Sequence, residues 1–484
     1  MTAQNTAATP QTRTDNETRV FVMHDLHPED CAMLQALYSR SPASVLTHLD
    51  KVKEVGAGKF MSRFYVGYGH ASIGDCGVTT VFVENVSMLA CKAIQDNPMY
   101  SGQEASTRYL DFSAQPMIDP YEHPYTTSIL NTWMSMYHQW LPVVTEALKK
   151  AHPFEAGEYK SEKSWLNTVE VRAFDIMRAF LPVGTTTLFS WTTNLRQARE
   201  RLMLLKSHPL PEVQDMARSI YTQMLEMYPH SFSGEEFADD SARYADRDAF
   251  NKAQAVKDNF QSMEEIVSRF DMTADEIHTM ENGGVVLRTQ SMDVDGLNRN
   301  EKATMAARPR GGVLSRRFAA YGNYNMAFMM DFGSYRDLQR HRNGICPLPL
   351  IDGQLGMYSW YMDELKRILT PADFTALFKQ TQEQFEKIRH LEQSGLKADR
   401  LKTQYLFPMG VAVPVSLSYS LPQLVYVGEL RSGKTVHPSL RPLAQEMLNV
   451  VAHFHPSLKL YGDMDADSWS EKRADQTITE KPAE

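Results

Sequence analysis

The chain has 484 residues, of which 43% are hydrophobic and 23% are charged, as in ordinary soluble globular proteins. Lysine and arginine number 50 against 59 aspartates and glutamates, and the net charge of −9 argues against non-specific binding to a nucleic-acid backbone. The four cysteines are scattered without CxxC or Cys/His spacing, so we expect neither a disulfide framework nor a metal site. No apolar segment resembles a signal peptide or a membrane span, and we expect a cytoplasmic protein.

The first half of the chain is predicted to contain both short strands and helices. A strand is expected at Val20 to Val22, and a helix after His27, because a proline and two acids follow and suit a first helical turn. Val81 to Val83 is a second strand candidate, and Val86 to Ala93 is predicted to be a helix. Helical spacing returns in three later segments, residues 165–180, 191–205 and 212–228.

The second half is predicted to begin with a connector. Residues 231–300 are rich in charge and turn formers, with one helix near Ala249 to Phe270. The apolar residues Met326 to Phe332 predict a strand, and residues 362–393 predict a helix that is interrupted near Thr370 to Asp373. Residues 1–18 and 463–484 are polar and lack periodicity, so both are predicted to be disordered tails.

Short motifs recur in the same order in two parts of the chain, which indicates an internal repeat. The recurring pairs are Leu181–Gly184 with Phe407–Gly410, 226 positions apart, Leu205–Pro209 with Leu430–Ser432 and His437-Pro438, and Gln214–Met216 with Gln445–Met447. We therefore predict an α+β protein of two related modules, residues 19–230 and 301–462. Fused in this way, the modules would behave as a covalent pseudo-dimer with a site between them.

The segment Tyr100 to Tyr109 (YSGQEASTRY) has the composition of a site for a nucleotide monophosphate. Its glycine permits a close approach of the backbone, its hydroxyl groups can donate hydrogen bonds, and Arg108 can bind a phosphate through two parallel hydrogen bonds. Gln103 and Glu104 can contact a base or a ribose hydroxyl. The alternative is a surface turn in which Arg108 pairs with a nearby acid, since surface ion pairs are common.

Two arginines flank a histidine at Arg340-His341-Arg342, shortly after the apolar segment that predicts a strand. We expect these residues at the end of that strand or on the following helix. Arginine side chains there can stack on an aromatic cofactor and bind its phosphates. The alternative is a solvated basic turn that is neutralised by Asp331 or Asp337.

Together, the two segments resemble separated parts of the signature of the flavin-dependent thymidylate synthase family, Arg-His-Arg-x-x-Ser-x-x-Glu-x-Ser-x-Arg-Tyr. The first module holds its second part, but Asp96-Asn97-Pro98 stands in place of Arg-His-Arg. The second module holds Arg340-His341-Arg342, but the residues that follow lack the Ser, Glu and Arg. The two modules thus retain complementary parts of one signature.

Other short motifs extend the resemblance through most of both modules. His70 and Ser72 are similar to the family's His-x-Ser segment, although Asp75-Cys76 replaces its usual Glu-His pair. Asn194-Leu195-Arg196 resembles the Asn-x-Arg that contacts the flavin. Leu430-Arg431 resembles a Leu-Arg pair whose guanidinium activates the pyrimidine, and the first module has Leu205-Lys206 there.

The resemblance implies reductive methylation of deoxyuridylate (dUMP) to thymidylate, with FAD as the cofactor and methylenetetrahydrofolate and NADPH as co-substrates. By the same resemblance, the nucleotide would be bound by Ser101, Gln103, Glu104, Ser106, Arg108 and Tyr109, the flavin by His70, Ser72, Asn194, Arg196, Arg340, His341 and Arg342, and Arg431 would activate the pyrimidine. A homodimer of fused modules would mimic the family's tetramer. The divided signature leaves open different flavin chemistry on a pyrimidine nucleotide, or a non-catalytic flavin- or nucleotide-binding protein.

Overall fold

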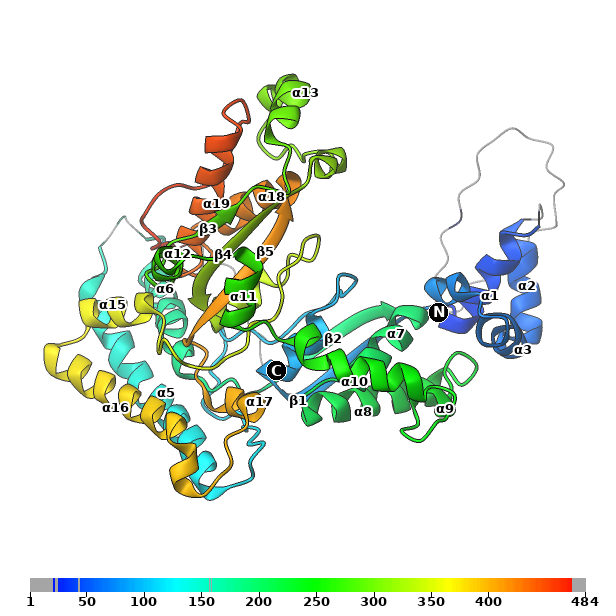
Figure 1. Cartoon of the computed structure of the whole chain (residues 1–484), viewed down its shortest axis with the longest axis horizontal. Coiled ribbons are helices and arrows are strands. Elements are labelled where there is room, and N and C mark those ends of the chain that lie inside the picture. Colours follow the sequence, from blue (N-terminus) through cyan, green and yellow to red (C-terminus); the bar gives the residue numbers. More distant parts are fainter. Residues whose placement is uncertain (1–20, 22–24, 42–43, 156, 158, 472–484) are drawn as a thin grey trace.

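The computed structural model describes residues 21, 25–41, 44–155, 157 and 159–471. Helices surround two small antiparallel sheets, which confirms the α+β class (Figure 1). The first sheet joins β1 (Val78–Ser87) to β2 (Thr186–Asn194), and the second has the strand order β3 (Val286–Arg288), β4 (Asn323–Asp331), β5 (Ala412–Ser420). Among the described helices, none is long and apolar enough to cross a membrane.

The first module is mostly helical outside its two strands. Its helices, with η marking 3-10 and π segments, are α1 (Pro28–Tyr38), α2 (Val45–Val55), α3 (Gly58–Phe60), η1 (Met61–Gly67), η2 (Ala71–Cys76), α4 (Met88–Gln95), α5 (Pro124–Ala151), α6 (Glu162–Met177), η3 (Arg178–Phe180), α7 (Leu195–Leu205) and α8 (Pro211–Met227). The helix expected after His27 is α1, which has Pro28 in its first turn. The strand expected at Val20 to Val22 lies outside the described residues except for Phe21.

The rest of the chain is also mostly helical outside its strands. Its helices are α9 (Gly234–Phe237), α10 (Ala245–Asn259), α11 (Met263–Phe270), α12 (Ala274–Glu281), α13 (Val294–Ala307), η4 (Arg316–Tyr321), α14 (Phe332–Leu338), α15 (Ser359–Ile368), α16 (Pro371–Arg389), η5 (Leu391–Ser394), α17 (Arg400–Thr403), η6 (Gln404–Leu406), α18 (Leu421–Arg431) and α19 (Arg441–Phe454). The interruption predicted near Thr370 is the break between α15 and α16, where the Thr370 side chain caps α16.

Both halves follow one order of elements: a strand, a short helix, longer helices, a 3-10 turn, a second strand and two helices. The second strand and the helix after it begin 226 positions apart in the two halves, at Thr186 and Ala412 for the strands and at Leu195 and Leu421 for the helices. The short helices α4 and α14 begin 244 positions apart, at Met88 and Phe332. This second interval aligns Asp96-Asn97-Pro98 with Arg340-His341-Arg342.

The two halves meet through the motifs Leu181–Gly184 and Phe407–Gly410, which pair antiparallel. The Val183 amide donates to the Phe407 carbonyl and the Met409 amide donates to the Leu181 carbonyl, each over 2.8 Å. The Gly184 and Gly410 amides bond in the same reciprocal way, to the carbonyls of Tyr405 and Ala179. Each of these bonds thus has a counterpart, in which the donor and the acceptor are the residues 226 positions away in the other half. This reciprocity is typical of an isologous two-fold interface. The halves form the predicted pseudo-dimer within one polypeptide.

Several predicted element boundaries differ from the structure, among them the start of the helix expected from Val86, because Val86 and Ser87 pair with β2. Residues 191–194 belong to β2 and not to the helix expected from 191, because Trp191 to Asn194 pair with β1. The single helix expected at 249–270 is two helices, α10 and α11, because Ser262 and Glu265 form a capping box that starts a new helix. The tail expected from 463 begins too early, because Trp469 stacks on His152 with ring centroids 3.8 Å apart.

The segment predicted to be a connector is divided between the modules. Its α10 reaches the first module, where Asp248 accepts a 2.7 Å hydrogen bond from Lys206. Its β3 pairs with β4 and so completes the second sheet. A small apolar cluster, which includes Ile266, Phe270 and Met280, covers the outer face of that sheet. The main core is continuous and contains residues of both halves.

Candidate active site

The segment Tyr100–Tyr109 reaches the second module through Glu104. Lys92 on α4 and Arg336 on α14 stand 244 positions apart, so they are counterparts in the repeat. The Lys92 Nζ lies 2.5 Å from Glu104 Oε2, and Arg336 Nη2 contacts the other carboxylate oxygen. The Glu104 side chain is only 2% exposed. A single buried acid of the first module is therefore shared by one cation from each module.

The charges around Glu104 keep it ionised. Burial would raise the pKa of this carboxyl, but Arg336, Lys92 and Arg340 together hold it well below its ordinary value. Burial is also the main reason why the pKa of Lys92 is lowered. A buried charge cluster of this kind costs free energy if any one member is removed.

Arg108 is oriented by an acid and touches the second module. Its Nε lies 2.8 Å from Asp175 Oδ1 and its Nη2 lies 3.2 Å from Asp175 Oδ2, which is a two-pronged pair. The same Nη2 donates to the carbonyl oxygen of Thr435 over 3.4 Å. Ser106 lies next to it and accepts a 3.3 Å bond from the Arg108 amide. The ion pair that was the alternative explanation for Arg108 is present, but it is buried at the junction of the modules.

The segment Arg340-His341-Arg342 follows α14, which is the helix directly after the predicted strand β4. His341 Nε2 accepts a 2.7 Å hydrogen bond from Arg431 Nε, and Arg431 also donates to the Asp337 carbonyl over 2.9 Å. Burial and the charge of Arg431 lower the pKa of His341 to about 3, so its imidazole is neutral at pH 7. The structure thus places Arg431 against the Arg-His-Arg segment.

A second acid, Asp337, lies among the arginines of both modules. Burial opposes its ionisation, but Arg340, Arg431 and Arg108 lower the pKa of this carboxyl well below its ordinary value. The distance from Arg340 Nε to Asp337 Oδ1 is 3.9 Å. The two separated segments of the sequence therefore form one buried, charged site.

Two arginines of this site, Arg340 and Arg342, are placed so that they could contact a ligand. Arg340 is 42% exposed and its two ion pairs are long, 4.0 Å to Glu104 and 3.9 Å to Asp337, so it keeps N–H donors for a phosphate. Arg342 lies over the Tyr100 ring with its guanidinium carbon 4.8 Å from the ring centroid. Guanidinium groups in such positions fit an aromatic, phosphate-bearing cofactor.

The remaining residues of the first segment lie at the edge of this site. The carbonyls of Ser101 and Gln103 accept bonds from Thr192 and Ser190 of β2, and both side chains are exposed. The glycine between them is required by β2, because a Cβ on Gly102 would lie 1.8 Å from the Ser190 carbonyl oxygen. Burial raises the pKa of Tyr109, whose hydroxyl also feels the charge of Arg108.

The other predicted flavin residues form a separate group. His70, Ser72, Asn194 and Arg196 lie where β1 begins and β2 ends, whereas the charged site follows the end of β1. Glu104 of the charged site lies opposite Phe189 of β2, and the five residue steps from Phe189 to Asn194 span roughly 17 Å. Arg196 Nε bonds Asp75 Oδ1 over 2.7 Å, and the Asn194 side chain caps α7. Within one chain, the structure does not bring these residues to Arg340.

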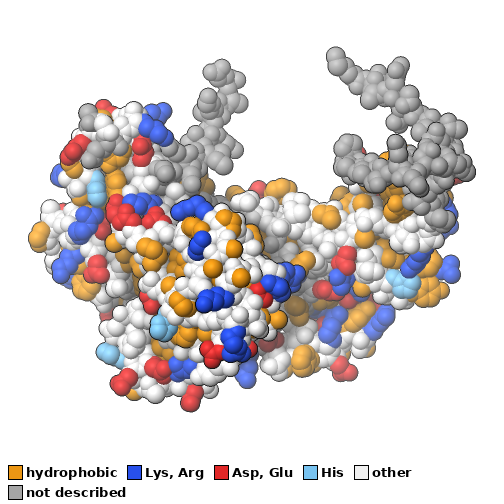
Figure 2. Space-filling model, turned by 90° about the horizontal axis from the view of Figure 1, so that it is seen from above, with side chains coloured by type: hydrophobic (Ala, Val, Ile, Leu, Met, Phe, Trp, Pro, Cys, Tyr) orange, Lys and Arg blue, Asp and Glu red, His pale blue; other side chains and the backbone are white. Residues whose placement is uncertain are grey.

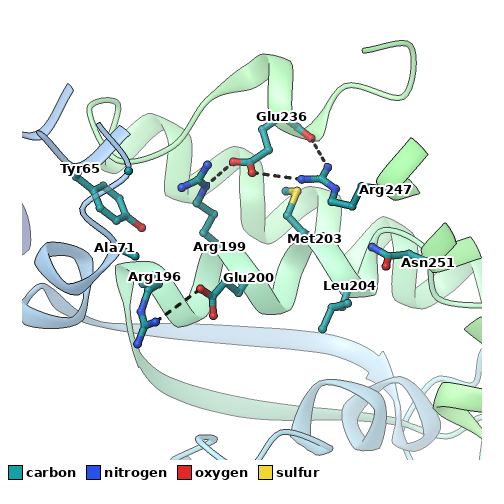
Figure 3. A pocket seen from close by; sticks show the side chains of 11 residues that line it. Tyr65, Ala71, Arg196, Arg199, Glu200, Met203, Leu204, Glu236, Arg247 and Asn251 are labelled. Carbon is teal, nitrogen blue, oxygen red and sulfur yellow. Dashed lines mark hydrogen bonds and ion pairs between the residues drawn. The ribbon is translucent and has the colours of Figure 1, made fainter. Parts of the chain in front are cut away.

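Arg196 lines a pocket of about 460 Å³ on the exposed side of α7. Figure 3 shows Arg196, Arg199 and Arg247 around it, with Arg199 and Arg247 both bonded to Glu236. Two of these residues, Glu236 and Arg247, come from the segment predicted to be a connector. Figure 2 shows acidic, basic and apolar side chains interspersed over one face of the molecule, in line with phosphate sites that are local.

Sequence reasoning missed several charged residues of the central site, namely Lys92, Asp175, Arg178 and Arg336. Arg178 is fully buried, donates a 3.0 Å hydrogen bond to Ser334 and lies 3.6 Å from Asp331 in the other module. The repeat held a signal for Lys92 and Arg336, because both are basic and both stand four residues before the Arg-His-Arg position of their module. No comparable signal marked Asp175.

These contacts define the class of the molecule: a covalent pseudo-dimer of α+β modules with a cationic site at their junction. Residues 22–230 match the family model described as "Thymidylate synthase complementing protein". This match covers the first module, whose signature resembles that of the flavin-dependent thymidylate synthase family.

The chain is also similar to proteins that span both modules. A UPF0159 protein of Thermoplasma acidophilum is 23% identical over 448 residues, which cover 82% of this chain and 87% of the relative. A UPF0159 protein of Chlamydia muridarum is 23% identical over 450 residues, which cover 84% of this chain and 80% of the relative. Because each alignment covers more than four fifths of the chain, the similarity extends beyond the first module.

Proposed function

We propose that the protein is a flavin-dependent thymidylate synthase that converts dUMP to thymidylate with FAD, methylenetetrahydrofolate and NADPH. One observation carries the proposal: the two separated parts of the family signature meet, with Glu104 of the first module against Arg336 and Arg340 of the second. The family match of residues 22–230 supports the same conclusion.

In this proposal the chain's own residues bind and orient the reactants. FAD, when bound, supplies the redox chemistry. Arg340 and Arg342 hold its phosphates and rings, and Ser106 and Arg108 hold the nucleotide phosphate. Arg431 donates toward negative charge that develops on the pyrimidine, as fixed N–H donors do in other active sites. The neutral His341 keeps Arg431 in place by accepting from its Nε.

Separate loss of the two ligands tests the composite site. Arg108→Ala is expected to weaken dUMP binding at least about tenfold while FAD is retained, and Arg342→Ala is expected to do the reverse, because each guanidinium provides charge-assisted bonds to one ligand. Calorimetry with dUMP and the flavin absorbance of the purified variants measure the two effects. If both variants kept both ligands, the composite site would be wrong.

Arg431 is expected to act in turnover. Arg431→Ala should leave dUMP and FAD bound but lower the rate by about 100-fold or more, the usual cost of removing a donor to a developing charge. Tritium release from labelled dUMP measures the rate. Unimpaired release would remove Arg431 from the mechanism.

The separation of His70 and Arg196 from the charged site favours a homodimer. A second copy could place its own group of flavin residues against Arg340 and Arg342 of the first, and such an assembly would have the four modules of the family's tetramer. Sedimentation of the flavin-loaded protein tests this. A monomer that retains turnover would contradict it.

One observation favours a second candidate, a protein that binds flavin or nucleotide without thymidylate synthesis, or that performs different flavin chemistry on a pyrimidine. Arg108 and Arg431 are both engaged by protein groups, Asp175 and His341. Flavin absorbance together with absent tritium release would favour this candidate over the synthase.

A further inference from the structure

The loop between α18 and α19 in the second module holds two groups of the first module. The carbonyl oxygen of Thr435 accepts a 3.4 Å hydrogen bond from Arg108 Nη2. His437 Nε2 lies 2.9 Å from the carbonyl oxygen of Asp175, and Asp175 is the acid that orients Arg108. The loop begins directly after Arg431. It therefore connects the residue proposed to activate the pyrimidine with the residue proposed to bind the nucleotide phosphate.

The hydrogen bonds of His437 determine which ring nitrogen carries the proton. Its Nδ1 accepts a 3.2 Å bond from the Ser439 amide, and its Nε2 must donate, because the Asp175 carbonyl oxygen can only accept. The ring is fully buried, and burial lowers its pKa well below the ordinary 6.5, so it is neutral at pH 7. Asp175 lies in the last turn of α6, where carbonyl oxygens need partners from outside the helix. His437 thus supplies a fixed N–H donor to the backbone of Asp175.

Both ends of this loop are bonded to buried groups of the second module. Near its end, the Ser439 hydroxyl donates a 2.6 Å bond to Asp331 Oδ1, and the other oxygen of Asp331 accepts a 2.9 Å bond from the Tyr361 hydroxyl. At its start, Arg441 Nε donates to the carbonyl oxygen of Ser432 over 2.8 Å. Ser439, Asp331, Arg441 and Ser432 are all buried. The loop is therefore a rigid support for the residues that it contacts.

The repeat provides an internal comparison for His437. Its counterpart is His208, the histidine of the same His-Pro motif in the first module. In both, Nδ1 accepts a bond from the amide two residues later, over 3.1 Å from Leu210 and over 3.2 Å from Ser439. Within the part of the chain that the structure describes, His208 Nε2 has no hydrogen-bond partner. The Nδ1 bond is therefore common to both halves, whereas, of the two histidines, only His437 bonds across to the other module.

We propose that His437 is a positioning residue for the nucleotide phosphate. It holds the backbone of Asp175, and the Asp175 carboxylate in turn holds the Arg108 guanidinium through two hydrogen bonds. The inference rests on the proposed function, in which Arg108 binds the phosphate. Because the same loop follows Arg431, it fixes Arg108 and Arg431 relative to each other. A fixed separation favours a nucleoside monophosphate, whose phosphate and base must be bound at one distance.

Two substitutions separate the two bonds of the His437 ring. Asparagine can still accept from the Ser439 amide but is too short to reach the Asp175 carbonyl, whereas glutamine places an N–H donor near the position of Nε2. In the ligand-free protein, His437→Asn should therefore raise the exchange rate of the Arg108 Nε–H with water about tenfold or more, and His437→Gln should keep it close to the original rate. NMR measures the rate, and Arg108→Lys identifies the signal by its loss. His208→Asn is the matched control and should leave the rate unchanged.

Calorimetry with dUMP tests the consequence for the ligand. His437→Asn should weaken dUMP binding about five- to tenfold, and His437→Gln should restore most of the affinity. In the Arg108→Ala background, His437→Asn should weaken binding further by less than about twofold, because it acts through Arg108. A general packing defect would instead add to the effect of Arg108→Ala and would not be corrected by glutamine.

Three results would overturn the role of His437. They are unchanged Arg108 Nε–H exchange in His437→Asn, additive effects of His437→Asn and Arg108→Ala on dUMP binding, and a folded His437→Gln protein that loses as much as His437→Asn. The proposed function would fail separately, if the unmodified protein did not bind dUMP. Faster exchange in His437→Asn, but not in His437→Gln, would still support the positioning of Arg108 in that case.

Discussion

At the scale of single residues, the repeat has been broken most clearly at Glu104. Its contacts come from Lys92 and Arg336, which are counterparts in the two modules. The interval of 244 positions that relates these cations makes Leu348 the counterpart of Glu104, so the second module has no such acid. One carboxylate is therefore shared by two buried cations, and the site between the modules is asymmetric.

Glu104→Gln is expected to destabilise the protein by about 3–5 kcal/mol, because it leaves Lys92 and Arg336 buried without their acid. Urea unfolding followed by circular dichroism measures the change. Glu84→Gln is the matched control, since Glu84 is exposed on β1, and its effect should stay within about 0.5 kcal/mol. Equal stability of the two variants would show that Glu104 does not hold the cluster together.

For single residues, the sequence identified the basic residues that could bind a ligand, but it did not identify the acidic residues that pair with them. The Arg-His-Arg segment and Arg108 could be singled out because their types and spacing match one signature. Asp175 and Asp337 could not, because an acid acquires its role only when the fold brings an arginine within about 3–4 Å of it. The predicted alignment of Leu205-Lys206 with Leu430-Arg431 was also wrong. The starts of α7 and α18 align Leu205, and not Lys206, with Arg431.

At the scale of elements, the junction of the two modules depends on two glycines. A Cβ on Gly184 would lie 2.7 Å from the Ile118 carbonyl oxygen, and a Cβ on Gly410 would lie 2.6 Å from the Ala179 Cβ. Neither neighbour is the end of a flexible side chain. The backbone pairing of Leu181–Gly184 with Phe407–Gly410 therefore leaves no room for a methyl group at either position.

Gly184→Ala and Gly410→Ala are each expected to cost about 1–3 kcal/mol through overpacking, and to cost less than additively together because they loosen one junction. Chemical unfolding of both single variants and the double variant measures this. Gly234→Ala is the control, since the nearest atom to its Cβ would be 3.8 Å away. A junction variant as stable as the control would contradict the packing argument.

The success of the element predictions depended on local signals. Strong ones, such as Pro28 at the start of α1 and Thr370 at the start of α16, placed helices correctly. The strand β5 received no prediction because Pro414 lies within it and argues against a strand, although apolar residues alternate with serine from Val415 to Ser420. β3 was hidden for another reason: it has three residues and its pairing with β4 is tertiary.

At the scale of the whole molecule, the two-fold relation is close in the backbone and incomplete in the side chains. The junction bonds are reciprocal, but Arg340, His341 and Arg342 have the counterparts Asp96, Asn97 and Pro98. The position that mirrors the charged site thus lacks its basic segment, and we expect one composite site per chain. By contrast, buried histidines occur in both halves, with His208 in the first and His437 at the corresponding motif of the second.

Acid stability is expected to depend on these histidines. Burial, reinforced by the charge of Arg201, lowers the pKa of His208 from its ordinary 6.5 to about 3. Between these two values the unfolded chain binds a proton that the folded protein does not, so stability is complete above about pH 6.5 and falls as the pH decreases toward 3. One such group contributes a slope of at most about 1.4 kcal/mol per pH unit.

His208→Asn should reduce this slope, because asparagine does not titrate and its side-chain oxygen can still accept the bond that the Leu210 amide donates to His208 Nδ1 over 3.1 Å. Urea unfolding between pH 4 and pH 7 measures the slope for each protein. His390→Asn, at an exposed histidine, should retain the slope of the unmodified protein. If His208→Asn kept that slope as well, protonation of His208 would not contribute to acid unfolding. The slope would then come from other groups whose pKa is shifted, among them His437, whose pKa burial lowers strongly, and His455, whose pKa burial lowers to about 4.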